Sequence, residues 1–370
     1  MDVVFVLPRW SRVPVGGYQM VYAHANAMAA RGHTVSVLHW AVISEPRWRG
    51  PAALLWRHGT SGGQHEAPTP WYDHDPAVRI RTVLRLPRRW AAGTAVVATA
   101  WRTSEVVAAR SAPGWGFSYL QSHETWSGPA GRVNASWRLP LHKLVIAGWL
   151  ADLASELGGG QVDIVPNFVD ESFRTPAPRA IERDRHRVAM LWHPHHVKGS
   201  DVGLAALERA RMIEPTLRAS VFSVYDRPAH IPSWMDWTAR PTRPELVDLL
   251  RSSLIFVSPS RMEGWALPPA EAMACGCVLV ATDIGGHADY AAAEVTGLLA
   301  PVEDSGGLAA AIVRLVRDPE LGSRLAAAGA ARVRSFTREA SADAFENALM
   351  ARAGTAPAEG RPVSPGGGRA

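Results

Sequence analysis

Short apolar runs alternate along the chain with segments whose apolar residues recur at helical spacing. Asp2–Leu7 contains five consecutive apolar residues, typical of a buried strand, and Tyr18–Arg31 has the period of an amphipathic helix. Gly32 ends that helix, and Thr34–Leu38 predicts a second strand. A strand, a glycine-containing loop, a helix and another strand in this order predict a βαβ unit and hence a parallel sheet.

The same alternation continues to a boundary near residue 170. Thr94–Ala100 and Gly116–Gln121 predict further strands. The stretch from Glu45 to Pro76 is rich in proline, arginine and glycine without a sustained period, which predicts surface loops. We therefore expect a first domain over residues 1–170, followed by a polar, proline-containing linker over residues 171–187.

A second series of alternating elements follows the linker. Its first predicted strand is Arg187–Leu191. The other expected elements are helices at Ser200–Arg211, Pro244–Ser252, Pro268–Cys275, Gly307–Arg317 and Glu320–Ser335, and strands at Ala219–Val224, Leu254–Ser258 and Val278–Ala281. We expect a second domain over residues 188–336, a last helix over 337–352 and a disordered Gly/Pro/Ala-rich tail over 353–370.

Composition agrees with two α/β domains. The chain has 370 residues, of which 47% are hydrophobic and 20% charged, as in a globular protein with two cores. Its only two cysteines, Cys275 and Cys277, are separated by one glycine, which excludes a disulfide framework and favours a reducing, cytoplasmic setting. The sequence contains no run of about 18 apolar residues, so we expect no transmembrane helix. The N-terminus resembles a first strand rather than a signal peptide.

Charge and tryptophan are unevenly distributed. Residues 1–165 hold 16 Lys+Arg against 10 Asp+Glu, a net +6, whereas residues 166–370 hold 23 against 24, a net −1. The first part also holds 11 of the 15 tryptophans. This bias favours an anionic or amphipathic partner for the first domain, although a codon bias toward arginine and tryptophan would produce the same pattern.

Part of the excess positive charge is a run of arginines without an intervening acid. Its members are Arg79, Arg81, Arg85, Arg88 and Arg89. The alternation of arginine with Ile80 at the start of this run fits the solvent-facing side of one strand, and this is the favoured interpretation. The second interpretation is peripheral contact with an anionic membrane or a phosphorylated acceptor. We expect no nucleic-acid partner.

The segment from Ser260 to Gly276 carries the most specific chemistry. Glu263 and Glu271 stand eight positions apart, between two apolar runs that predict strands. A glycine loop and a Pro-Pro helix start lie between the two acids. Helix N-termini attract phosphate, and carboxylates accept hydrogen bonds from sugar hydroxyls. The combination predicts a nucleotide-sugar site.

Three other groups follow predicted strands at the carboxyl edge of a sheet, where open α/β folds bind ligands. Gly16 and Gly17 follow the first strand, where they let a phosphate or sugar approach the backbone or simply form a turn. His123, beside Glu124, can hydrogen-bond a substrate or donate a proton, or be an ordinary loop histidine. The chain contains no Gly-x-Gly-x-x-Gly or Walker motif, which argues against NAD binding and ATPase chemistry.

The third group follows the first strand of the second domain. It contains His193, His195, His196 and Lys198. Lys198 supplies a point charge that can meet a diphosphate. A metal site and a solvated loop are the alternatives for the histidines, and no acid stands near them in the sequence.

These motifs together resemble the retaining glycosyltransferases of family 4, which have the GT-B fold. The resemblance covers about residues 160–340, and the first half matches only in its Gly-Gly loop and general layout. The motifs are Pro166–Asp170, Lys198-Gly199, Pro259–Gly276, and Gly285-Gly286 with Gly297–Pro301. The implied fold is two Rossmann-like, doubly wound domains facing across a cleft, with the last helix crossing back to the first domain.

The resemblance also implies roles for individual residues. Glu263 would bind hydroxyls of the donor sugar, Glu271 the ribose, and Lys198 the departing diphosphate. The backbone from Gly264 through Trp265 and Ala266 to Leu267 would hold the sugar and diphosphate. The implied catalytic residues are Glu263, Lys198 and His123, and the implied donor-binding residues also include Gly16, Gly17 and His193. No metal or other cofactor is implied.

Two positions depart from the family pattern. His193 stands where the family commonly has arginine, so the grip on the donor is expected to be weaker or to depend on pH. Trp265 and Ala266 replace the usual Phe-Gly, which is expected to reshape the sugar pocket.

The expected activity is transfer of a sugar from a nucleotide diphosphate sugar to an acceptor hydroxyl with retention of anomeric configuration. The acceptor can be a saccharide, a lipid-linked molecule or a small molecule. Two alternatives stay open: a catalytically silent module that binds nucleotide-sugar, and a nucleotide-sugar hydrolase or epimerase on the same fold.

Overall fold

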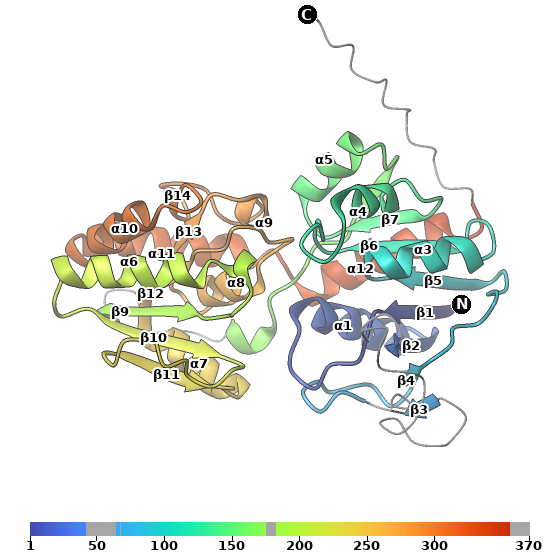
Figure 1. Ribbon diagram of the computed structural model, residues 1–370, viewed down its shortest axis with the longest axis horizontal. Helices are drawn as coiled ribbons and strands as arrows, with labels where there is room; N and C mark the ends of the chain where they lie inside the picture. Colours follow the sequence, from blue (N-terminus) through green and yellow to red (C-terminus); the bar gives the residue numbers. More distant parts are fainter. Residues whose placement is uncertain (42–63, 67, 175–182, 356–370) are drawn as a thin grey trace, which may run out of the picture. The chain divides into compact units, whose positions relative to one another are not determined.

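The computed structural model of the chain describes residues 1–41, 64–66, 68–174 and 183–355. Most of the predicted loop segment, half of the predicted linker and most of the predicted tail lie outside these residues. The chain forms two compact units, and each contains one sheet (Figure 1). The first unit combines Met1–Pro166 with the segment that begins at Glu339, and the second is Asn167–Arg338.

The sheet of the first unit has the strand order β3-β4-β2-β1-β5-β6-β7-β8. Its strands are β1 (Asp2–Leu7), β2 (Thr34–Trp40), β3 (Gln64–Glu66), β4 (Arg79–Val83), β5 (Thr94–Ala98), β6 (Gly116–Leu120), β7 (His142–Val145) and β8 (Val162–Ile164). All neighbours pair in parallel except β3, which runs antiparallel to β4 at one edge. The predicted parallel sheet is therefore confirmed, with one antiparallel edge strand added.

Helices cover both faces of this sheet. They are α1 (Gly16–Ala30), α3 (Trp101–Arg110), α4 (Ala130–Ser136), α5 (Gly148–Glu156) and α12 (Arg338–Arg352). Side chains alternate between faces along a strand. Phe5 of β1 stacks on Phe345 of α12, whereas Val6 packs with Val107 of α3 on the opposite face. Because β1, β5 and β6 are parallel neighbours, their carboxyl ends lie at the same edge of the sheet. Helices α1 and α3 begin after β1 and β5, next to this edge.

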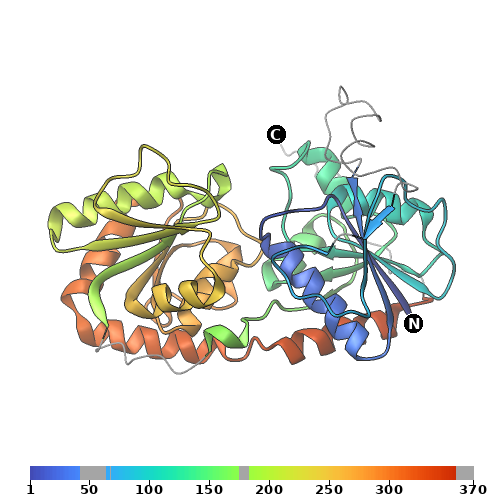
Figure 2. The same cartoon turned by 90° about the horizontal axis from the view of Figure 1, so that it is seen from below.

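The last helix completes the first unit, although it is last in the chain (Figure 2). Phe345 is fully buried and stacks on Phe5 and His24, with ring centroids 5.6 and 4.5 Å apart. Its edge meets the ring of Tyr119 at 5.8 Å. Arg352 adds an ion pair to Asp163 at 2.9 Å. The expected return of the C-terminal helix to the first domain is thus confirmed.

The sheet of the second unit has the order β11-β10-β9-β12-β13-β14, and all its pairs are parallel. Its strands are β9 (Asp184–Leu191), β10 (Arg218–Ser223), β11 (Met235–Ala239), β12 (Ser253–Ser258), β13 (Val278–Thr282) and β14 (Gly297–Ala300). β9 begins three residues before the strand that the sequence predicted. The central neighbours β9 and β12 place the loops that follow them side by side.

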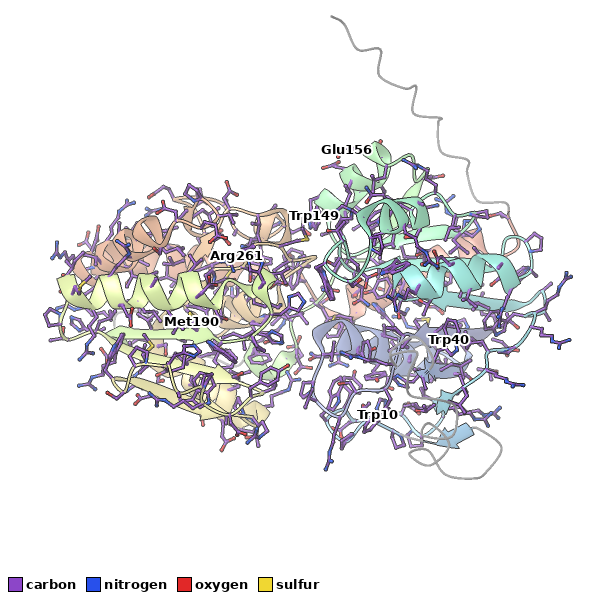
Figure 3. All side chains as sticks on the ribbon, in the orientation of Figure 1. Trp10, Trp40, Trp149, Glu156, Met190 and Arg261 are labelled. Atoms are coloured by element: carbon purple, nitrogen blue, oxygen red, sulfur yellow. The ribbon has the colours of Figure 1, made fainter. Side chains whose placement is uncertain are left out.

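The helices of the second unit are close to those that the sequence predicts. They are α6 (Ser200–Ile213), α7 (Arg243–Ser252), α8 (Leu267–Ala274), α9 (Gly285–Ala288), α10 (Ser305–Arg317) and α11 (Pro319–Val333), with the 3-10 turns η2 (Glu171–Phe173) and η4 (His196–Lys198). Apolar side chains of α6 and α10 form one core with β9, β10, β12 and β13, in which Met190 is fully buried (Figure 3). The two-sheet fold class is confirmed.

We expect Phe345→Ala to destabilise the first unit by about 3–5 kcal/mol, because it leaves a cavity among three aromatic rings. Urea denaturation followed by circular dichroism measures this change. Met350→Ala on the same helix is the control, since Met350 is 60% exposed and its truncation removes little buried area. Equal effects of the two substitutions would contradict the role assigned to α12.

Candidate functional site

Lys198 and Glu263 form an ion pair at the carboxyl edge of the second sheet. Lys198 lies in η4 after β9, and Glu263 lies in the loop between β12 and α8. The ammonium nitrogen is 2.7 and 2.9 Å from the two carboxylate oxygens, and the Ser260 hydroxyl donates to Oε1 at 2.8 Å. The sequence places these residues 65 positions apart, and the pairing of β9 with β12 joins their loops.

Glu263 is also enclosed from the side of α9. A methyl group added to Gly286 would lie 2.6 Å from the Glu263 carbonyl oxygen and closer still to its Cβ. Only a residue without a side chain fits there. The Gly-Gly motif at Gly285 and Gly286 thus positions the acid by close backbone approach.

Arg261 fixes the loop that carries Glu263. Its guanidinium forms two hydrogen bonds with Asp201, at 2.9 and 2.8 Å, and pairs with Glu303. It also donates to the carbonyl oxygen of His196 at 2.7 Å. No local sequence pattern marks Arg261 as a structural residue, because its three partners come from separate segments of the chain.

His193 stands beside this pair as a neutral ring. Burial, followed by the positive charge of Lys198, lowers the pKa of His193 to about 4. Its Nδ1 accepts the backbone N–H of His195 at 3.0 Å, so the ring proton is assigned to Nε2. His193 therefore offers one uncharged N–H donor at neutral pH. The three histidines of this loop do not form a metal-binding group, and none occurs elsewhere in the described residues.

Glu271 is buried inside α8, with 8% of its surface exposed. Burial raises the pKa of this carboxyl to about 7; the nearby charge of Arg243 lowers it and that of Asp170 raises it. Arg243 begins α7 and its guanidinium lies over the Phe173 ring. Glu271 can thus gain or lose a proton near neutral pH, unlike a solvent-exposed glutamate.

Trp265 and Ala266 face the core of the unit. The indole of Trp265 is 4% exposed and meets the rings of Tyr290 and Phe336 edge-on, at 4.9 and 5.3 Å. The backbone N–H of Ala266 donates to Gly286 O, and its carbonyl accepts the Tyr290 hydroxyl. The structure therefore places the large side chain away from solvent and leaves the Ala266 N–H already occupied.

The start of α8 offers few donors to an anion. Leu267 is its first residue, and Pro268 and Pro269 follow. Proline has no N–H, so two of the usual free donors of a helix N-terminus are missing. The phosphate attraction expected of this helix start is correspondingly limited to its remaining N–H groups.

The residues expected in the first unit lie at the carboxyl edge of its own sheet. Gly16 and Gly17 begin α1, and the Gln121 amide lies over Gly17. His123 follows β6, where its Nε2 bonds with Asn134 Oδ1 at 2.7 Å. Glu124, which no sequence pattern marks as a helix cap, accepts the backbone N–H of Trp101 at the start of α3, at 2.8 Å.

The arginine run begins on β4, in line with the favoured strand interpretation. Arg79 is exposed, Arg81 is half-buried, and Ile80 between them is buried. Arg81 and Arg85 also line a pocket of about 410 Å³ floored by apolar residues of β1, β2 and β4. None of the helices described here is long and apolar enough to span a membrane.

Comparison with known proteins finds a family model that matches part of the second unit. Residues 234–332 match the family model described as "Glycosyl transferases group 1". This stretch of the second unit is similar to group 1 glycosyltransferases. The matched region contains the Glu263–Glu271 segment and the Gly285-Gly286 loop, which confirms the resemblance inferred from these motifs.

Curated relatives match part of this chain over part of their own length. A D-inositol 3-phosphate glycosyltransferase of Segniliparus rotundus is 26% identical over 204 residues, which are 50% of this chain and 45% of that protein. A lipopolysaccharide core biosynthesis mannosyltransferase of Rhizobium leguminosarum is 36% identical over 78 residues, or 21% of this chain and 22% of that protein. The match thus spans less than half the length of each of these two relatives.

Solved structures share the whole fold. The sucrose-phosphate synthase of Thermosynechococcus elongatus has a TM-score of 0.69 at 16% identity, covering 95% of this chain and 99% of that one. Anabaena HepE in complex with UDP and glucose also has a TM-score of 0.69, at 15% identity, with coverage of 95% and 99%. Both likenesses establish the GT-B-like fold.

We expect Gly286→Ala to displace Glu263, because the new methyl group overlaps the Glu263 backbone. The expected cost is about 1–3 kcal/mol of stability. Thermal unfolding of the second unit measures it. Gly306→Ala is the matched control, since Gly306 is exposed in the first turn of α10 and its added methyl meets nothing closer than 3.4 Å. A Gly286→Ala protein as stable as the control would contradict this packing.

The pKa of Glu271 predicts a pH-dependent stability. Between pH 4.5 and 7 the folded state keeps a proton that the unfolded state has released, so stability falls as pH rises through this window. The loss for a shift of about 2.5 units is on the order of 3 kcal/mol. Glu271→Gln, which stays neutral, is expected to flatten the decline of the melting temperature between pH 5 and 8.

Calorimetric scans across this pH range make the comparison, and Glu208→Gln on the exposed side of α6 is the control. An unchanged pH dependence in the Glu271→Gln protein would show that the carboxyl is already ionised in the folded state.

Proposed function

We propose that this protein transfers a sugar from a nucleotide diphosphate sugar to an acceptor hydroxyl, with retention of anomeric configuration and without a metal ion. The observation that carries the proposal is the paired Lys198 and Glu263, enclosed by Ser260 and Gly286, in a stretch similar to group 1 glycosyltransferases. Charge of both signs at one sheet edge suits a donor that carries hydroxyls on one side of the reacting bond and phosphates on the other.

The ion pair leaves capacity for both parts of the donor. An ammonium has three N–H donors, and the Glu263 oxygens accept two of them, so one remains for a phosphate oxygen. The carboxylate has about four acceptor positions, of which Lys198 and Ser260 take three. One is left for a sugar hydroxyl. The donor can therefore bind without separating Lys198 from Glu263.

The reaction breaks the bond between the anomeric carbon and the diphosphate oxygen. Negative charge grows on that oxygen, and Lys198 together with the neutral Nε2–H of His193 stabilises it. The acceptor oxygen bonds to the anomeric carbon, and its proton leaves with the diphosphate. Glu271 would accept hydrogen bonds from the ribose hydroxyls, which favours its ionised form.

In this proposal the first unit supplies the acceptor side of the reaction. Gly17, Gln121 and His123 stand at the carboxyl edge of its sheet, next to the start of α1. Saccharides, lipid-linked molecules and small molecules are all compatible with this general placement. Membrane contact through the arginines of residues 79–89 would suit a lipid-linked acceptor.

We expect Glu263→Gln to lower turnover at least 100-fold, because the amide keeps the size of the side chain but loses the charge that holds Lys198. Release of nucleotide from UDP-, GDP-, dTDP- and ADP-sugars measures turnover, after a thermal-shift screen identifies the donor. Glu208→Gln, on the exposed side of α6, should behave like wild type. Wild-type turnover in the Glu263→Gln protein would overturn the site assignment.

Product analysis by NMR separates the alternatives. A transferred sugar with retained anomeric configuration supports the proposal. Free sugar with any acceptor identifies a hydrolase, and an altered donor sugar identifies an epimerase. Donor binding without turnover under all these conditions identifies a silent binding module.

A further inference from the structure

A pocket of about 410 Å³ lies on one face of the first sheet. Pockets that hold small molecules have volumes of about 300–1,000 Å³, so its size admits a ligand or part of one. The pocket belongs to the first unit, whereas Lys198 and Glu263 belong to the second. The apolar residues that line it are Val4, Leu38, Val83, Leu86, Pro87 and Trp90.

The pocket is open because no helix of the described residues covers this part of the sheet. Helix α3 packs against β5 and β6. Connections between parallel strands usually contain a helix, but residues 84–93, which connect β4 to β5, contain neither helix nor strand. Val4, Leu38 and Trp40 are therefore only half-buried, although they pack against the apolar cluster of this face (Figure 3).

The connection that forms one wall of the pocket is fixed to α3. The Arg110 guanidinium donates to the carbonyl oxygens of Leu86 and Pro87, at 3.2 and 3.1 Å. The Trp90 N–H donates to the Arg110 carbonyl oxygen at 2.9 Å. Leu86 and Trp90 also belong to the same buried apolar cluster as Val107 of α3. The wall is thus held by α3, and the pocket is a built feature of the fold.

Three arginines of the same connection have no ionic partner among the residues that the structure describes. Arg85, Arg88 and Arg89 are exposed, and none forms an ion pair or a side-chain hydrogen bond there. The strand interpretation of the arginine run does not explain them, because β4 ends at Val83. None of the described residues that line the pocket is acidic. Apolar surface and unneutralised positive charge therefore occur together.

The acids of the nearby strands stand elsewhere in the register. Glu66 of β3 is opposite Arg81, within β4. Asp2 begins β1, at the amino end of the strand, whereas Arg85 follows the carboxyl end of the parallel strand β4. The three arginines of the connection thus keep their charge available at this edge of the described structure.

We propose that the pocket takes an acyl chain of an anionic phospholipid while Arg85, Arg88 and Arg89 bind phosphate head groups, so that the first unit attaches to an anionic membrane surface. This develops the membrane contact named above and does not depend on glycosyl transfer. Guanidinium groups pair with phosphate through two parallel hydrogen bonds. Binding to a membrane surface increases with buried apolar area and with attraction to anionic lipid, and this face supplies both.

Other anionic partners would use only one part of this face. A nucleic acid or a free phosphate ion would pair with the arginines and leave the apolar floor exposed to water. A phospholipid carries its phosphate and its apolar chains in one molecule, so it satisfies the charge and the floor together.

Vesicle co-sedimentation of the full chain tests the attachment. We expect binding to vesicles of equal parts phosphatidylcholine and phosphatidylglycerol to be stronger, by about tenfold or more, than binding to phosphatidylcholine alone, and to weaken as salt rises. Equal binding to both vesicle types, or binding to neither, overturns the inference. A single-stranded oligonucleotide that binds more tightly than the anionic vesicles also overturns it, because it identifies a nucleic-acid surface.

Charge reversal then tests the arginines. The triple variant Arg85→Glu, Arg88→Glu, Arg89→Glu is expected to lose its binding to anionic vesicles. The control changes net charge equally by reversing three exposed arginines of the second unit that also have no described ion pair, Arg185→Glu, Arg209→Glu and Arg218→Glu. Melting temperatures check that both proteins fold. An equal loss in both proteins is a general charge effect and overturns the assignment.

Ser36→Phe tests the pocket, because Ser36 lines it and the new ring would fill it while the arginines stay intact. Thr34→Phe is the control, since it adds the same ring to the same face of β2 outside the pocket lining. We expect binding to anionic vesicles to weaken by about tenfold in the Ser36→Phe protein alone. Wild-type binding in that protein would show that the pocket takes no chain.

Calorimetric titration of the wild-type protein repeats the pocket test without a substitution. The probes are dihexanoyl phosphatidylglycerol, a soluble short-chain lipid, and inorganic phosphate. Saturable binding of the lipid alone is expected. Phosphate binding of equal affinity would identify a bare anion site, and either this result or the absence of lipid binding overturns the role of the pocket.

The membrane inference and the proposed function fail in different ways. Glu263→Gln is expected to bind anionic vesicles like the wild-type protein. Vesicle binding without donor turnover contradicts only the proposed function. Donor turnover that depends on Glu263, in a protein that does not bind anionic vesicles, contradicts only the membrane inference.

Discussion

A charged carboxylate held in a crowded loop is the constraint around which the second unit is arranged. Glu263 is mostly removed from solvent, with 13% of its side chain exposed, so its charge needs a close partner. Lys198 supplies that partner only because β9 and β12 are neighbours. Gly286 must lack a side chain to let Glu263 fit, and Arg261 ties the loop to Asp201 and Glu303.

Some ionisable groups of this site keep one protonation state at neutral pH, whereas others change theirs. Burial keeps His193 neutral, with a pKa of about 4, so this position binds an oxygen as an N–H donor rather than as a cation. Donor binding was expected to depend on pH through His193, and the protonation of this ring now falls below the physiological pH range. Glu271, with a pKa of about 7, changes charge near neutrality.

The prediction from sequence was strongest where the chemistry is local. Glu263 and Glu271 lie in one short segment between two apolar runs, and the strands β12 and β13 and helix α8 lie close to where periodicity placed them. It was weaker for long-range partners. Glu124 caps α3 across 23 residues, and Arg261 bridges to Glu303 across 42, so neither contact leaves a local signal.

Residue order and composition alone were sufficient for the two α/β domains and the family motifs. These depend on apolar periodicity and on short glycine-, proline- and acid-containing segments, which are local properties of a chain. The return of the final helix to the first domain was expected only from the resemblance to a known family. Packing alone decided that Trp265 faces the core, that Ala266 N–H is occupied, and that His193 is neutral. Each of these three features depends on burial and on partners that the sheets bring close together. Strand pairing determines these partners, and they cannot be read from the order of residues.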